Sequence, residues 1–194
     1  MHKLTRNDLY SLEHYCEIRD DFRRKIMAHK NSRRLLLGDA VMLLFEDRLL
    51  TQYQVQEMLK IEKIFDPAGI EEELAAYNPL IPDGSNWKAT MMLEYTDPEE
   101  RRRQLARLQG IEEKVWLQVA GLAKIYAIAD EDLERSNEDK TAAVHFLRFE
   151  LDENMVSAAK AGADISAGID HPHYQVAARK LPASLHEALR ADLA

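Results

Sequence analysis

Cysteine is nearly absent from this chain, which contains Cys16 and no other cysteine among its 194 residues. A single thiol excludes an intrachain disulfide and any cysteine-rich zinc site built by one chain. It equally excludes an iron–sulfur cluster held by the cysteines of one chain. Redox chemistry in this protein would therefore need a centre of another kind.

Long apolar runs are also missing. The residues that follow Met1 are charged and polar with no apolar stretch behind them, which is not the pattern of a secretory signal peptide. No run approaches the roughly 20 apolar residues that a membrane-spanning helix needs. We therefore expect a cytoplasmic protein without a membrane partner. The chain also lacks a Gly-x-Ser-x-Gly elbow, a P-loop and a Gly-x-Gly-x-x-Gly turn.

The chain has no excess of positive charge, because its formal net charge at pH 7 is −8. This balance argues against broad nucleic-acid affinity. One stretch departs from it, with basic side chains at Arg19, Arg23, Arg24, Lys25, Lys30, Arg33 and Arg34. Because Asp20 and Asp21 lie within the stretch, we interpret it as a solvated helix face, and RNA binding is the alternative.

Hydrophobic periodicity predicts an α+β protein with a helical N-terminal part packed on a mostly antiparallel β-sheet. Helices are expected at 5–15, 21–34, 54–65, 70–77, 152–162 and 185–193, and between Asp97 and Gly110. Strands are expected at 41–45, 87–95, 114–120, 124–129, 143–151, 164–170 and 174–180. We expect a single compact domain over residues 1–194, mainly helical over 1–80 and mainly strands with interspersed helices over 81–194.

The predicted helix at 54–65 carries acidic groups where an amphipathic helix should be apolar. At about 100° per residue, Gln56, Lys60 and Lys63 share one polar sector. Glu62 then falls near the centre of the opposite, apolar arc, and Glu57 lies near its edge. Gln54 points in the same direction. A buried carboxylate costs several kcal/mol unless it is paired, protonated or metal-bound, so this helix is expected to need partners from the sheet.

Histidines at two predicted strands could supply such partners. His145 alternates with Leu147 and Phe149 on one face of the strand at 143–151, so we expect it to be half-buried, with Arg148 on the opposite face. His171 follows another strand, next to Pro172. Carboxylates together with imidazoles suit iron, manganese or zinc.

The sequence thus predicts one candidate metal site. Its ligands would be Glu57, Glu62, His145 and His171, with Gln54, Glu94 and Arg148 in supporting positions. Glu46 and His173 are further candidates of the same chemistry. A purely structural alternative uses no metal, because Arg33, Arg34, Arg48 and Arg148 are available as counter-ions for the helix carboxylates.

Several motifs together resemble a bacterial family catalogued as a domain of unknown function. They are Leu44-Phe45-Glu46-Asp47-Arg48, Gln54-Val55-Gln56-Glu57-Met58-Leu59, Tyr77-Asn78-Pro79-Leu80-Ile81-Pro82, Ala89-Thr90-Met91-Met92-Leu93-Glu94, Ala143-Val144-His145-Phe146-Leu147-Arg148-Phe149 and His171-Pro172. The similarity covers nearly the whole chain. It implies an association with rubrerythrin-like di-iron proteins and iron–sulfur oxidoreductases of the heterodisulfide-reductase type, beside which such proteins are often encoded.

Two hypotheses lead, and they belong to different classes. The first is an accessory or adaptor protein of a redox or peroxide-response system, with a rubrerythrin-like or iron–sulfur oxidoreductase protein as its partner. The second is a metal-binding protein or enzyme that uses the Glu/His site. An RNA-associated role is a third hypothesis, and a homo-oligomer is compatible with all three.

Overall fold

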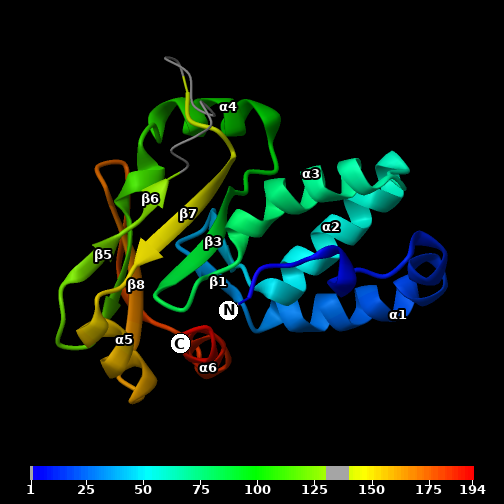
Figure 1. Ribbon diagram of the computed structural model, residues 1–194. Coiled ribbons are helices and arrows are strands. Elements are labelled where there is room, and N and C mark those ends of the chain that lie inside the picture. Colours follow the sequence, from blue (N-terminus) through cyan, green and yellow to red (C-terminus); the bar gives the residue numbers. More distant parts are fainter. Residues whose placement is uncertain (1, 130–139) are drawn as a thin grey trace.

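A computed structural model gives the arrangement of residues 2–129 and 140–194, and confirms the α+β class (Figure 1). In these residues six α-helices accompany nine strands, which form two antiparallel sheets rather than one. None of these helices is both long and apolar enough to cross a membrane.

The strands divide into a five-stranded and a four-stranded sheet. The five-stranded sheet has the order β1 (Arg34–Leu37), β2 (Val41–Phe45), β3 (Asn86–Leu93), β7 (Val144–Glu150) and β6 (Ile128–Ala129). The four-stranded sheet has the order β5 (Lys124–Tyr126), β4 (Val115–Val119), β8 (Ile165–His171) and β9 (Tyr174–Lys180). The chain passes from one sheet to the other at Ala127, whose N–H donates to the carbonyl of Val115 at 2.8 Å.

The main hydrophobic core joins the inner faces of the two sheets. Trp87 and Phe149 from the five-stranded sheet belong to the same buried cluster as Leu117 and Ile169 from the four-stranded sheet. The alternation of buried and less buried residues along β7 places His145 on this inner face and Arg148 on the outer face, as the sequence predicts.

Three helices form a layer beside the five-stranded sheet: α1 (Leu12–Asn31), α2 (Arg48–Glu62) and α3 (Pro67–Tyr77) (Figure 1). A second apolar cluster fixes this layer, because Phe22 of α1 and Tyr53 of α2 pack with Leu44 of β2. The other helices are α4 (Pro98–Arg107), α5 (Glu153–Lys160) and α6 (Ala183–Ala191), and α6 ends close to the C-terminus.

The structure corrects two expectations near the N-terminus. The predicted helices at 5–15 and 21–34 are one continuous helix, α1, which begins after its N-cap Ser11. The capping box of Thr5 and Asp8 exists, but it closes a short 3₁₀ turn that precedes α1. The helix ends at Asn31, and Arg34, expected as the last residue of the second helix, instead begins strand β1; the chain then turns at Gly38, and β1 pairs with β2.

The orientation of α2 is also corrected. Gln56, expected in the exposed polar sector, is completely buried and accepts a hydrogen bond from the Tyr10 backbone N–H at 2.6 Å. Ile61, expected inside, is 68% exposed. The cause is that α2 packs against both α1 and α3. Its surface therefore does not divide into one exposed face and one buried face.

Gly168 makes close packing in the four-stranded sheet possible, because a Cβ atom there would lie 2.3 Å from Cζ2 of Trp116 on the neighbouring strand. We predict that Gly168→Ala lowers the free energy of unfolding by about 1–3 kcal/mol through overpacking. Urea denaturation followed by circular dichroism measures this. Ser166→Ala, on the same strand, is the control, and equal stability of the two variants would contradict the prediction.

Candidate functional site

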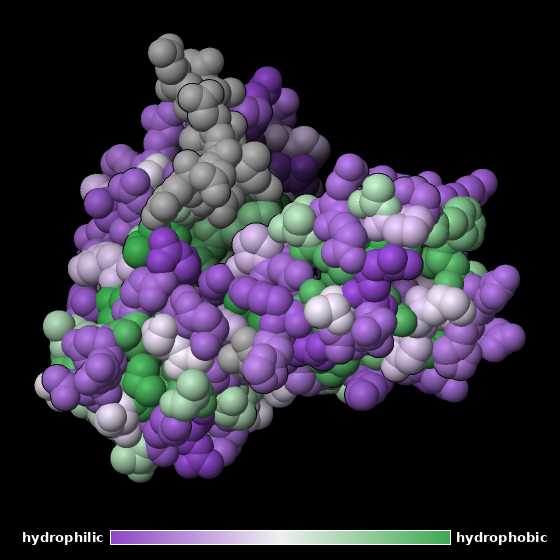
Figure 2. Space-filling model, in the orientation of Figure 1, coloured by the Kyte–Doolittle hydropathy of each residue, from purple (hydrophilic) through white to green (hydrophobic). Residues whose placement is uncertain are grey.

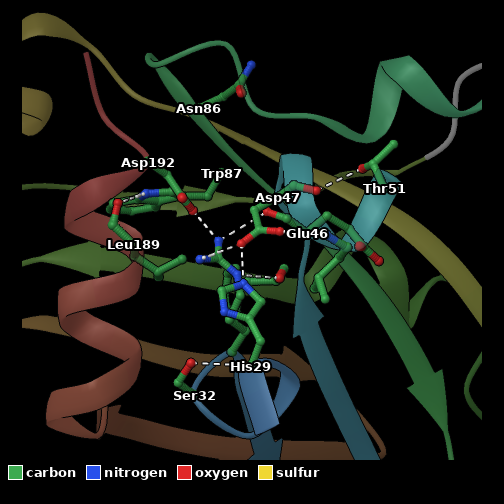
Figure 3. A network of polar contacts seen from close by, with 12 residues as sticks. His29, Ser32, Glu46, Asp47, Thr51, Asn86, Trp87, Leu189 and Asp192 are labelled. Carbon is green, nitrogen blue, oxygen red and sulfur yellow. Dashed lines mark hydrogen bonds and ion pairs between the residues drawn. The ribbon is translucent and has the colours of Figure 1, made fainter. Parts of the chain in front are cut away.

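A buried arginine contacts several charged groups at the junction of the helical layer with β1 and β2 (Figure 3). Arg33 is only 2% exposed. Its Nε donates to the Phe45 carbonyl at 2.9 Å, and its Nη2 donates to the Glu46 carbonyl at 3.1 Å. The guanidinium also contacts two carboxylates, those of Asp47 and Asp192.

Asp47 is the first of these carboxylates and connects α2 with α1 and with Arg33. It is the N-cap of α2, where its Oδ1 accepts from the Leu50 N–H at 2.8 Å. Its Oδ2 lies 3.3 Å from Nη1 of Arg33 and 2.5 Å from Nε2 of His29 on α1. One side chain therefore caps a helix and anchors the cation at the same time.

Asp192 is the second carboxylate and comes from the C-cap of α6. It pairs with Nη2 of Arg33, while burial raises the pKa of the Asp192 carboxyl to about 6 against the opposing effect of the arginine. Next to it, the indole N–H of Trp87 donates to the Leu189 carbonyl at 2.9 Å. These contacts fasten the C-terminal helix to the rest of the fold (Figure 3).

Glu46 lies beside this network but takes a different partner. It is nine-tenths buried, and the Thr90 hydroxyl donates to its Oε1 at 2.5 Å. Burial raises the pKa of the Glu46 carboxyl, while Thr90 and the nearby Lys30 act in the opposite direction. Burial also lowers the pKa of the Lys30 ammonium.

We call Arg33, Asp47, Asp192 and His29 the Arg33 network. It has two carboxylates for one permanently charged guanidinium, so it gains a proton more readily than a neutral ion pair would. Its contacts join α1, β2, α2 and α6 through side chains that already have partners. The network therefore holds these elements together, and its protonation depends on pH.

The predicted ligand Glu57 is half-buried, but its partners come from α1 rather than from the sheet. Arg19 forms a two-pronged contact with it, Nε to Oε1 at 2.8 Å and Nη2 to Oε2 at 2.7 Å. The Tyr15 hydroxyl donates to Oε1 at 2.6 Å. Arg19 is the main reason that the pKa of the Glu57 carboxyl is lowered. Glu57 therefore has an arginine partner, as in the structural alternative, but the partner is Arg19 and none of the four arginines named for that role.

Glu62, Gln54 and Glu94 lie on the surface. The expectation that Glu62 faces inward is wrong, because α2 ends at this residue and Lys63 follows in the left-handed conformation, with φ of 57°. Arg148 contacts Glu150 on its own strand.

Both predicted histidines are buried and engaged with the protein itself. His145 Nε2 lies 2.9 Å from the Thr141 hydroxyl and 3.0 Å from the Ala142 carbonyl. His171 accepts from the His173 N–H through Nδ1 at 3.2 Å, and its Nε2 lies 3.1 Å from the Gln109 carbonyl. Both ring nitrogens of His171 are therefore used. His173 itself is exposed.

The structure does not bring the predicted metal ligands together. Glu57 contacts α1, Glu62 faces solvent, and the two histidines bind separate loops. Within residues 2–129 and 140–194, no three side chains of His, Cys, Asp or Glu form a group that could hold a metal ion. The basic stretch between Arg19 and Arg34 is also not one solvated helix face, because α1 ends at Asn31 and Arg33 beyond it is buried.

Sequence reasoning missed a surface at the far end of the helical layer. We call residues 61–66, the last two residues of α2 and the link to α3, the α2–α3 elbow. Ile61 and Phe65 of this elbow are 68% and 70% exposed, the highest values among the large apolar side chains that the structure describes. The elbow lies away from both sheets (Figure 1), and Figure 2 shows apolar residues at the surface of the helical part. The sequence did not indicate this surface, because the apolar arc assigned to the 54–65 helix placed both side chains in the core.

The fold and this polar centre define an α+β protein with two facing antiparallel sheets, a three-helix layer and a buried arginine network. The chain belongs to the family described as protein of unknown function (DUF3501), whose model matches residues 3–193. It is similar to a protein of unknown function from Burkholderia pseudomallei whose crystal structure is known. The two are 50% identical, with a TM-score of 0.94 and full coverage of both chains. A search of curated proteins finds no match.

Proposed function

We propose that this protein is a non-enzymatic accessory protein that docks onto a partner of a redox or peroxide-response system. The observation that supports docking is the exposure of Ile61 and Phe65 at the α2–α3 elbow. Large apolar side chains that are exposed on an otherwise polar surface are typical of protein–protein contacts. Each could contribute about 1.5–3 kcal/mol when a partner covers it.

The partner class rests on a separate argument. The motifs of this chain resemble a family often encoded beside rubrerythrin-like and iron–sulfur oxidoreductase proteins. With one cysteine per chain, this protein cannot hold a cysteine-ligated cluster by itself. An accessory role would leave the redox centre to the partner.

The test is a binding measurement between the purified chain and the rubrerythrin-like and iron–sulfur oxidoreductase proteins of the same organism. We expect one of them to bind, and we expect Ile61→Ser/Phe65→Ser to weaken its binding at least about tenfold, or about 1.4 kcal/mol. Because both side chains are exposed, the free energy of unfolding should change by less than about 1 kcal/mol.

Met27→Ser is the matched control, because Met27 is a partly exposed apolar residue of α1 outside the elbow. It should bind as the unmodified chain does. If neither partner binds the unmodified chain, the proposed function is wrong. If the double variant binds as tightly as the control, the elbow is not the docking surface.

A further inference from the structure

The segment of the chain that contains the two exposed apolar side chains of the α2–α3 elbow has an excess of negative charge. The chain between residues 60 and 73 carries more carboxylates than cations, namely Glu62, Asp66, Glu71, Glu72 and Glu73 against Lys60 and Lys63. Among the described residues, none of these carboxylates forms a salt bridge. The charge of this region is therefore not neutralised within the fold.

Other helices of the protein behave differently. Acidic residues pair with an arginine one turn later in α1, α4 and α6, as in Asp21–Arg24, Glu99–Arg102 and Glu187–Arg190. Helix α3 contains no lysine or arginine that could do the same. The excess of negative charge is thus a local property of the surface beside Ile61 and Phe65.

Glu73 is the carboxylate most affected by this excess of negative charge. Its Oε2 atom is buried and, among the described residues, has no hydrogen-bond partner. Burial and the neighbouring carboxylates Glu62 and Glu72 raise the pKa of the Glu73 carboxyl. A cation placed beside Glu62 and Glu73 would relieve the repulsion between these like charges.

We propose that the α2–α3 elbow binds a basic, apolar segment of its partner. Large apolar side chains of that segment cover Ile61 and Phe65, and a lysine or arginine pairs with Glu62 and Glu73. The inference rests on the proposed docking function and adds the chemistry of the partner. Complementary charge of this kind gives specificity and speeds association, and its effect falls as salt is added.

The test compares two short amphipathic peptides with the same leucine pattern, one with lysine and one with glutamate at every polar position. Their binding to the full chain is followed by NMR of the backbone amides. We expect the lysine peptide to shift amide signals within residues 60–73, and the glutamate peptide to leave them in place. Glu62→Gln/Glu73→Gln should weaken binding of the lysine peptide at least about fivefold.

Glu99→Gln/Glu100→Gln is the control, since it removes the same amount of charge from exposed positions of α4. It should bind the lysine peptide as the unmodified chain does. Equal loss in both variants, or equal binding of both peptides, would overturn the charge inference. The docking function would then still stand if Ile61→Ser/Phe65→Ser loses its protein partner, so the two failures are distinguishable.

Discussion

Replacing Arg33 by methionine is expected to lower the free energy of unfolding by about 3–5 kcal/mol, the largest loss that we predict for one substitution. The loss is large because the substitution removes the guanidinium and leaves its partners in place. Asp47 and Asp192 would stay buried without their guanidinium, and the carbonyls of Phe45 and Glu46 would lose their donors. Urea denaturation at neutral pH measures the loss.

Arg34→Met is the control for this substitution. Arg34 is the next residue in the chain and the first of β1, but it is exposed, so its replacement should change stability by less than about 1 kcal/mol. A loss below about 1 kcal/mol for Arg33→Met would show that the network contributes little to folding. In the Asp192→Asn background the cost of Arg33→Met should be smaller, because one carboxylate fewer is left without its counter-ion.

The contrast between Arg33 and the strands shows what the sequence can reveal. Strand β7 and its inward His145 were predictable, because alternation of side chains along a strand is a local property. The same holds for the helix capped by Asp97, with Pro98 at its first position. The pairing of β8 with β9 was also predictable from two short strands close together in the chain.

Arg33 was not predictable by such local patterns, because its partner Asp192 is 159 residues away. In the sequence it stands among other basic residues and looks like part of a solvated face. For the same reason Gln56 looked exposed, although the backbone of Tyr10, far earlier in the chain, satisfies its side chain. Long-range contacts decide whether a polar residue is buried, and local periodicity does not contain them.

The candidate site also has a part that the sequence could predict and a part that it could not. The pattern of the 54–65 segment indicated that Glu57 needs a partner, and Arg19 and Tyr15 supply it. The pattern could not show that α2 stops at Glu62, because the turn at Lys63 has no glycine to mark it. The elbow and its exposed apolar side chains follow from that unmarked helix end.

A second large effect concerns pH, and it should appear in Asp192→Asn. Burial raises the pKa of the Asp192 carboxyl from 3.8 to about 6, with Arg33, Asp47 and His29 as the charged or titratable groups that act on it. Between these two pH values the folded protein keeps a proton that the unfolded chain has lost. The contribution of Asp192 to stability is therefore fully present below about pH 4 and is lost as pH rises through 6.

The expected size of this loss is about 3 kcal/mol, since one pKa unit corresponds to about 1.4 kcal/mol. Asparagine stays neutral and keeps an oxygen that can accept from Arg33, so Asp192→Asn should gain stability relative to the unmodified chain as pH rises from 4 to 8. Urea denaturation across this range measures the difference. Asp20→Asn, at an exposed position of α1, should run parallel to the unmodified chain. A constant difference between Asp192→Asn and the unmodified chain would mean that the ion pair with Arg33 outweighs burial and keeps Asp192 ionised.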